Sequence, residues 1–127
     1  MLLNLSNHPS HLWDEQQVVQ ATKLYGKIED IPFPTISPTE DTDAVTWLAE
    51  SYLNICQEKL KSSTDKINAV HLMGELTFTF ALVVRLQRCN ILCVASTAKR
   101  DVLDYGNGQK KVSFDFISFR EYPNLNP

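Results

Sequence analysis

The most constraining feature of the sequence is a short apolar segment near its middle, at residues 67–73. Its apolar members are Ile67, Ala69, Val70, Leu72 and Met73. A near-continuous apolar run of this length is typical of a strand that is buried on both faces of a parallel sheet. Parallel strands need a crossover connection between them, usually a helix. The sequence on either side should therefore supply helices and further strands.

Helices are predicted on both sides of this strand. Apolar residues recur before it at steps of three and four, the pattern of an amphipathic helix: Val45, Leu48, Ala49, Tyr52, Leu53, Cys56 and Leu60. We expect Thr42 or Asp43 to cap this helix and residues 62–65 to end it. After the strand, residues 74–75 predict a turn and residues 76–88 a further helix.

The first part of the chain predicts one more strand, helix and strand. Residues 2–5 form a short apolar strand that ends in turn formers. Asp14 is the expected cap of the helix that follows, with Gln17 completing a capping box. Gly26 is expected to end that helix in a left-handed conformation. Residues 28–33 then predict a second strand.

The C-terminal part predicts a fourth strand over residues 91–95, followed by a β-hairpin. Residues 102–105 and 110–120 are its strands, and glycines in residues 106–108 supply the turn. Asp115 interrupts an apolar, aromatic stretch, which indicates a bulge or a partner surface. This order implies an α/β fold, a three-layer Rossmann-like sandwich with a mainly parallel sheet (β-α-β-α-β-α-β) plus a C-terminal β-hairpin.

Composition restricts both the organisation and the class of partner. The 127 residues carry a net charge of −3, which offers no basic field to duplex nucleic acid. No stretch is long and apolar enough for a membrane span. Reduced, unpaired cysteines (Cys56, Cys89 and Cys93) suit a cytoplasmic protein. We expect one domain over residues 1–122 and a flexible tail over residues 123–127.

Polar residues follow three of the predicted strands. They are Ser6, Asn7 and His8 after the first strand, Gly74, Glu75 and Thr77 after the third, and Ser96, Thr97, Lys99 and Arg100 after the fourth. In an open parallel sheet, ligands bind in the crevice beyond the carboxyl ends of the strands. We therefore expect these three segments to line one ligand-binding crevice.

Neither a metal nor a cofactor is expected. His8 and His11 could form a metal-binding pair, but the sequence offers no further set of ligands beside them. No G-x-G-x-x-G or Walker lysine motif is present, which argues against ordinary dinucleotide or nucleoside triphosphate binding. His71, inside the apolar strand, is interpreted as a hydrogen-bonded core residue rather than a catalytic base.

The candidate residues allow structural as well as functional interpretations. Gly74 permits backbone to approach a ligand, but glycine at a helix start can serve packing alone. Glu75 can be a surface carboxylate, an acceptor for a ribose hydroxyl or a general base. Lys99 and Arg100 can hold phosphate or form a solvated charge pair. The turn after the first strand can bind a ligand or simply lead into the first helix.

Two segments resemble a known family. The opening residues 2–10, Leu-Leu-Asn-Leu-Ser-Asn-His-Pro-Ser, with Tyr-Gly-Lys-Ile at residues 25–28, look like small stand-alone CRISPR-associated proteins. The strand and the Gly-Glu-Leu-Thr turn at residues 74–77 resemble CRISPR-associated Rossmann-fold (CARF) domains. The turn lacks the lysine that CARF domains often carry there. The order of elements is similar over most of the chain.

The resemblance implies a function and places it on particular residues. CARF domains are usually homodimers that bind cyclic oligoadenylate across the two-fold interface, and some, the ring nucleases, cleave it through a ribose 2′-hydroxyl. The resemblance carries ligand contact to Ser6, Asn7, His8, Gly74, Glu75 and Thr77. For a metal-independent cleavage we assign proton transfer to His8 and charge stabilisation to Lys99 or Arg100.

Other classes of function remain open at this point. The protein could be a non-enzymatic assembly protein whose aromatic C-terminal hairpin is the partner surface. The same scaffold could also serve a small-molecule transferase or hydrolase, because a fold does not fix a function.

Overall fold

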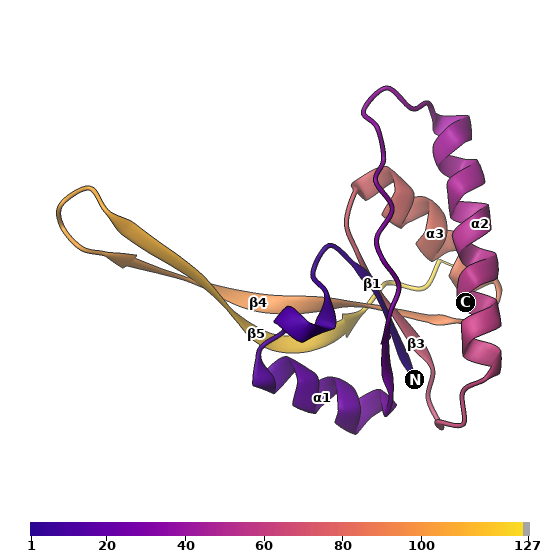
Figure 1. The fold of residues 1–127 in the computed structure, drawn as a ribbon, viewed down its shortest axis with the longest axis horizontal. Coiled ribbons are helices and arrows are strands. Elements are labelled where there is room, and N and C mark those ends of the chain that lie inside the picture. The colour runs from indigo at the N-terminus through magenta and orange to yellow at the C-terminus, as the bar shows by residue number, and fades with distance from the viewer. Residues whose placement is uncertain (126–127) are drawn as a thin grey trace.

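The strands of the computed structural model, which describes residues 1–125, form one sheet of five strands in the order β2-β1-β3-β4-β5 (Figure 1). The parallel strands are β1 (Leu2–Ser6), β2 (Ile28–Asp30), β3 (Ala69–Met73) and β4 (Leu92–Asp104). The last strand, β5 (Lys110–Glu121), is antiparallel to β4. The predicted Rossmann-like α/β fold with its C-terminal hairpin is confirmed.

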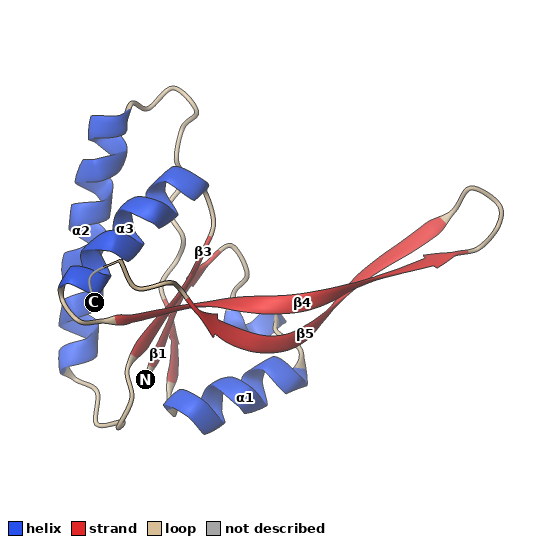
Figure 2. Ribbon diagram, turned by 180° about the vertical axis from the view of Figure 1, so that it is seen from behind, coloured by secondary structure: helices blue, strands red, loops and turns tan. Residues whose placement is uncertain are grey.

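Helices cover both faces of this sheet, which makes three layers. Helix α1 (Glu15–Tyr25) lies on one face, after a short 3-10 helix (Ser10–Leu12), whereas α2 (Thr42–Lys61) and α3 (Leu76–Arg88) lie on the other (Figure 2). Each face has its own buried core. Leu2, Ala69 and Val94 pack under α1, and Leu3, Leu5, Val70 and Leu72 pack under α2 and α3.

The helix ends follow the local chemistry of their caps. Asp14 caps α1 as predicted, and its carboxylate accepts the N–H of Gln17 at 2.8 Å. Gly26 ends that helix with φ +87°, where a Cβ atom would lie 2.2 Å from Asp65 Oδ1. The expected cap of α2 was wrong by one or two residues. Asp41 caps it instead, because its extended backbone lets the carboxylate accept the N–H of Ala44.

Residues 69–73 of the central apolar run form β3, and all of these except Met73 are buried. The strand begins at Ala69 rather than at residue 67, because Ile67 is exposed and unpaired with β1. β2 is shorter than predicted and ends at Asp30. Pro32 has no N–H to continue a ladder, and the chain leaves the sheet there.

The largest correction concerns β4, which does not end near Ala95 but continues to Asp104. Residues 94–104 pair with β5, so residues 96–100, which were expected to follow the fourth strand and line the crevice, are part of a two-stranded ribbon. The hairpin turn has positive φ at Gly106 and Gly108, as predicted. A register shift opposite Thr97 and Ala98 leaves Ile117 as an extra residue, which confirms a bulge in the interrupted stretch.

The outer part of this ribbon extends well beyond the three layers (Figure 1). β4 pairs with β3 only as far as Val94, and beyond that residue its partner is β5 alone. The segment expected as a tail begins against α3, because Gln87 hydrogen-bonds the carbonyl of Pro123 and the N–H of Leu125. Residues 126–127 of that segment lie outside the described residues.

Candidate functional site

The carboxyl ends of three strands meet around one side chain, Met73. Ser6 at the end of β1 is in register with Met73 at the end of β3, and the N–H of Asn7 donates to the Met73 carbonyl at 3.2 Å. From β4, the hydroxyl of Ser96 contacts Met73 Sδ at 3.1 Å. The structure therefore brings together the beginnings of all three segments that the sequence singled out.

The turn after β1 is held in place from beneath. The backbone carbonyl of His8 accepts hydrogen bonds from Asn4 Nδ2 at 3.0 Å and from Trp13 Nε1 at 2.9 Å, and Ser6 Oγ lies 3.1 Å from it. The side chains of Asn7 and His8 are exposed and make no hydrogen bond among the described residues. The turn thus has a fixed backbone and presents two free polar side chains to solvent.

Asn4 is the centre of the network that holds this turn, and its side chain is almost fully buried. Its Nδ2 donates to His8 and, at 2.7 Å, to Asp30 Oδ1. Its Oδ1 accepts the hydroxyl of Ser6 at 2.8 Å and lies 2.8 Å from His71 Nδ1. Because that amide oxygen can only accept, His71 must carry its proton on Nδ1.

The other ring nitrogen of His71, Nε2, is buried and has no hydrogen-bond partner in the described part of the chain. The imidazole lies edge-on to Trp13 and Phe119, with ring centroids 5.3 and 5.6 Å away. Burial, with a smaller contribution from His8, lowers the pKa of His71 to about 4. His71 is therefore neutral at pH 7, as expected of a core histidine.

Asp30 connects this network to the first helical turn. Its Oδ2 accepts the hydroxyl of Ser10 at 2.6 Å, and its Oδ1 accepts the Ser10 N–H at 3.0 Å. Burial alone would raise the pKa of Asp30, but the hydrogen bonds from Ser10 and Asn4 outweigh it and lower the pKa. A groove of about 320 Å³ lies beside this cluster, lined by Asn4, Ser6, Asn7, Pro9 and residues 30–33.

The start of α3 is arranged around its own carboxylate. Glu75 accepts the N–H groups of Thr77 and Phe78 at 3.1 and 2.8 Å, together with the Thr77 hydroxyl. The hydrogen bond from Phe78, followed by those from Thr77, lowers the pKa of Glu75. The helix N-terminus is therefore occupied by Glu75, a capping role that sequence reasoning did not consider.

Gly74 is required by packing. A Cβ atom at this position would lie 2.1 Å from Cζ of the Phe33 ring. That ring in turn stands edge-on to Phe78, with centroids 5.4 Å apart. The close approach that the glycine permits is thus an approach of Phe33, from the loop after β2.

The candidates on β4 run away from the site along the ribbon. The Thr97 hydroxyl pairs with that of Ser118 at 2.9 Å, beside the bulge. Lys99 Nζ lies 3.9 Å from Asp101, and Arg100 is in register with Phe114. At about 3.3 Å per residue, Lys99 lies roughly 10 Å beyond Ser96. Ser96 belongs to the site, whereas Thr97, Lys99 and Arg100 lie outside its centre.

Comparison with known proteins places the chain in one family. Residues 1–120 match the family described as Uncharacterized protein MJ1673 family. The chain belongs to this family. No curated protein and no solved structure matches the chain. The matched residues include every residue of the site and almost the whole ribbon, so the family is defined over the complete arrangement described above.

The described part of the chain contains neither a metal-binding cluster nor a helix that could span a membrane. In residues 1–125, no group of three or more His, Cys, Asp or Glu side chains is placed to hold a metal ion. None of the helices in the same residues is long and apolar enough to cross a membrane.

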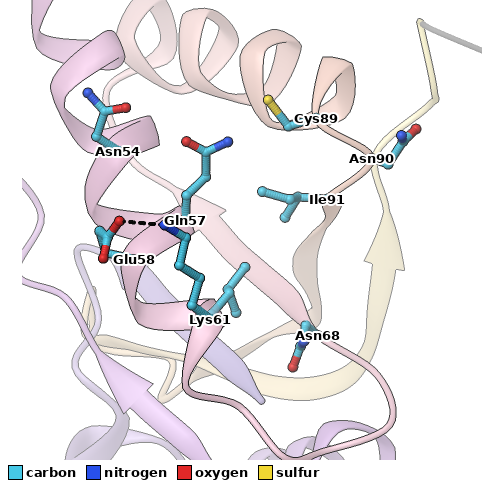
Figure 3. Close-up of a pocket in the computed structure, with 9 residues that line it drawn as sticks. Asn54, Gln57, Glu58, Lys61, Asn68, Cys89, Asn90 and Ile91 are labelled. Carbon is cyan, nitrogen blue, oxygen red and sulfur yellow. Dashed lines mark hydrogen bonds and ion pairs between the residues drawn. The ribbon is translucent and has the colours of Figure 1, made fainter.

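A second groove, of about 610 Å³, lies near the amino ends of β3 and β4, beside the C-terminal ends of α2 and α3 (Figure 3). The groove is lined by the side-chain amides of Asn54, Gln57, Asn68 and Asn90. Glu58 and Lys61 also line it and form an ion pair, with 2.8 Å between Oε1 and Nζ. It contains none of the residues that the sequence indicated. Its charged groups neutralise each other, so it offers no fixed charge to a ligand.

Sequence reasoning missed the residues that support the site, namely Asn4, Ser10, Trp13, Asp30 and Met73. One signal was available for Asn4, which is a polar residue between leucines in a strand that had to be buried. Buried amides are almost always hydrogen-bonded, so Asn4 pointed to a polar network whose other members could not be identified without the fold.

Proposed function

We propose that this protein is a CARF-like, homodimeric nucleotide-binding module that takes a cyclic oligoadenylate or a related nucleotide at the carboxyl ends of β1 and β3. The observation that carries the proposal is the turn after β1. The buried side chains of Asn4 and Trp13 donate to the His8 carbonyl, and the side chains of Asn7 and His8 make no hydrogen bond among the described residues. A preorganised backbone with free polar side chains is what a binding site requires.

Asn7 is the residue we assign to base recognition. A free carboxamide presents one acceptor and two donors, which match the N6 and N7 positions of adenine. It borders the groove formed with residues 30–33, and Phe33 adds an aromatic wall to that groove. An adenine edge is therefore the group that this part of the site suits best.

The phosphates of the ligand lie away from α3. Glu75 already takes the N–H groups at the start of that helix and adds a negative charge there. The cations are on the ribbon, at Lys99 and Arg100, and His8 lies on the β1 turn. We therefore place the phosphate groups between His8 and the base of the ribbon, with a second copy of the chain closing the site.

A thermal-shift titration with linear and cyclic adenylates tests the proposal. A ligand at a hundred times its dissociation constant should stabilise the fold by about 2.7 kcal/mol. Asn7→Ala should reduce that shift without lowering the melting temperature of the free protein, because the Asn7 side chain is exposed. Asn54→Ala, in the groove near the amino ends of β3 and β4, is the matched control and should leave the thermal shift unchanged. Absence of a shift with every adenylate would overturn the proposal.

The second candidate function is a non-enzymatic assembly protein that acts through the ribbon. One observation favours it: the ribbon exposes large apolar side chains, among them Val102, Leu103, Val112 and Phe114. Exposed apolar surface of this kind marks interaction sites. An assembly protein would associate through the ribbon but show no thermal shift with any adenylate, which separates the two candidates.

A further inference from the structure

The ribbon carries a continuous apolar stripe on one of its faces. Val102 pairs directly with Val112, and Phe114, two residues further along β5, has its side chain on the same face. Next on this face comes Phe116, which is buried among the aromatic rings beneath α1. The stripe thus begins in the core and continues into solvent, where Phe114 is 65% exposed.

The opposite face of the ribbon is mostly polar over residues 99–103, with Leu103 as its exposed apolar side chain. Lys99 pairs with Asp115 in register, and Asp101 hydrogen-bonds Asp115 and so raises the pKa of that carboxyl group. The row of Val102, Val112 and Phe114 has no counterpart of the same extent on the opposite face, so the face that continues from the α1 side of the sheet is the better suited to packing.

The free edge of β5 is protected against strand pairing. Asp14 Oδ2 accepts the N–H of Phe116 at 3.4 Å, and the bulge at Ile117 interrupts the ladder beside it. Lys110 and Lys111 add charge to the outer end of the strand. Bulges and lysines are common means of blocking edge-to-edge association. The ribbon is therefore built to bind through its face and not through its edge.

A second apolar surface lies in a groove of about 610 Å³ between α2 and α3. Leu76 and Phe80, on the outer side of α3, are 82% and 65% exposed. Glu40 and Asp41 give one part of this groove a negative charge, and Arg85 and Arg88 line another part. Arg85 is already paired with Glu50, with 2.8 Å between Nε and Oε1.

The ribbon and this groove cannot meet within one chain. Both views show the ribbon pointing away from α2 and α3 (Figures 1 and 2). From Ala98 to Asp104 the strand alone spans about 20 Å, which gives the ribbon the reach of an arm. An isolated chain leaves both apolar surfaces in water. In a pair of copies, the ribbon of each chain can pack against the groove of the other.

We propose that the ribbon of one copy lies with its apolar face in the α2–α3 groove of a second copy, and that the second copy returns the same contact. This inference rests on the homodimer of the proposed function and names its interface. Arg100 and Lys110, on the apolar face of the ribbon, complement Glu40 and Asp41, and Asp104 complements Arg88. A reciprocal exchange of arms closes with two-fold symmetry, the commonest symmetry of homodimers.

Two exposed aromatic residues allow the two halves of the contact to be broken separately. Phe114→Ser disables the arm and Phe80→Ser disables the groove, and neither side chain contributes to the core. Val19→Ser, at an exposed apolar position on the outer side of α1, is the matched control. In sedimentation equilibrium without nucleotide, each of the first two variants should weaken the dimer about tenfold or more, whereas the control should not.

A mixture of the two disabled variants distinguishes an exchange of arms from other dimers. The mixed pair retains one intact arm in one intact groove, so the mixture should associate more tightly than either variant alone. The proposed interface would be overturned if the mixture associates no more tightly than either variant alone, or if Phe80→Ser dimerises like the wild type. Neither result would contradict the existence of a dimer. A wild-type protein that is monomeric at about 10 μM would overturn both the interface and the homodimer itself. Nucleotide binding is measured separately, so its failure does not affect these outcomes.

Discussion

His71 makes the stability of the protein depend on pH. Burial lowers its pKa to about 4, whereas the unfolded chain takes up the proton near 6.5. Between these two values the unfolded state binds more protons, so stability is complete above pH 6.5 and falls as the pH decreases toward 4. The loss should be on the order of 3 kcal/mol.

Urea unfolding of the wild type and of His71→Leu at several pH values measures this contribution. The variant should be less stable at pH 7, but its stability should fall less between pH 6.5 and 4. Asn4 Oδ1 keeps its hydrogen bond from Ser6 in the variant, so the amide is not left unpaired. Parallel pH profiles for the two proteins would show that His71 does not cause the dependence.

Gly74 tests whether this turn is shaped by packing or by a ligand. A methyl group at this position meets the Phe33 ring, so Gly74→Ala should destabilise the free protein by about 1–3 kcal/mol. The same substitution in a Phe33→Leu background should cost less, because the obstructing ring is absent. Equal costs in the two backgrounds would mean that Phe33 is not the reason for the glycine.

Single residues were predictable only where their partners are local. Asp14 and Gln17 are three residues apart, and the sequence was sufficient to pair them. Asn4 and His71 are 67 residues apart, and their hydrogen bond depends on β1 and β3 being neighbours. Glu75 has local partners as well, but its carboxylate was interpreted as a surface group, an acceptor for a ribose hydroxyl or a general base, and not as a cap.

At the scale of elements, the helices were predicted well and the fourth strand was not. α3 begins and ends where it was predicted, at Leu76 and Arg88, although its β-branched and aromatic residues also allowed a strand. Residues 96–100 carry hydroxyl and charged side chains, which locally indicate a loop. They extend as a strand because β5 returns beside them, and that pairing is a tertiary effect that local composition does not encode.

The amphipathic character of α3 gives a direct test of its packing. Leu82 is fully buried between the helix and the sheet, so Leu82→Ala should cost about 2–5 kcal/mol in urea unfolding. Val19 on α1 is more than half exposed, and Val19→Ala should change stability by less than about 0.5 kcal/mol. Similar costs for the two substitutions would contradict the assigned core.

At the scale of the whole molecule, β4 connects the site to the ribbon. Its residue Ser96 contacts Met73 in the site, and its residue Arg100 pairs with Phe114 of β5 on the arm. An exchange of arms would therefore hold the strand ends of the two copies, which together form the shared site, in a fixed relation. Lys99, on the polar face at the base of the arm, is placed to contact a ligand that both copies share, whereas Arg100 lies on the face assigned to the groove.

Cleavage of a bound ring is the chemical step to test on this arrangement. Attack by the ligand's own 2′-hydroxyl should leave 2′,3′-cyclic phosphate ends, and turnover should persist in EDTA. His8→Ala should slow cleavage about 10²–10⁴-fold and leave the fold intact, because only the backbone of His8 takes part in the network. Lys99→Ala should weaken binding of the anionic ring. Full cleavage by the His8 variant would exclude its role in proton transfer, and tight binding without cleavage would make the protein a sensor.

Titration calorimetry of the wild type with cyclic oligoadenylates of different ring size tests the central claim most directly. A site that two copies share should bind one ring for every two chains, with an affinity that falls in Asn7→Ala and is unchanged in Asn54→Ala. Saturation at one ring per chain would contradict the shared site. The absence of heat and of any thermal shift with every ring size would contradict nucleotide binding itself.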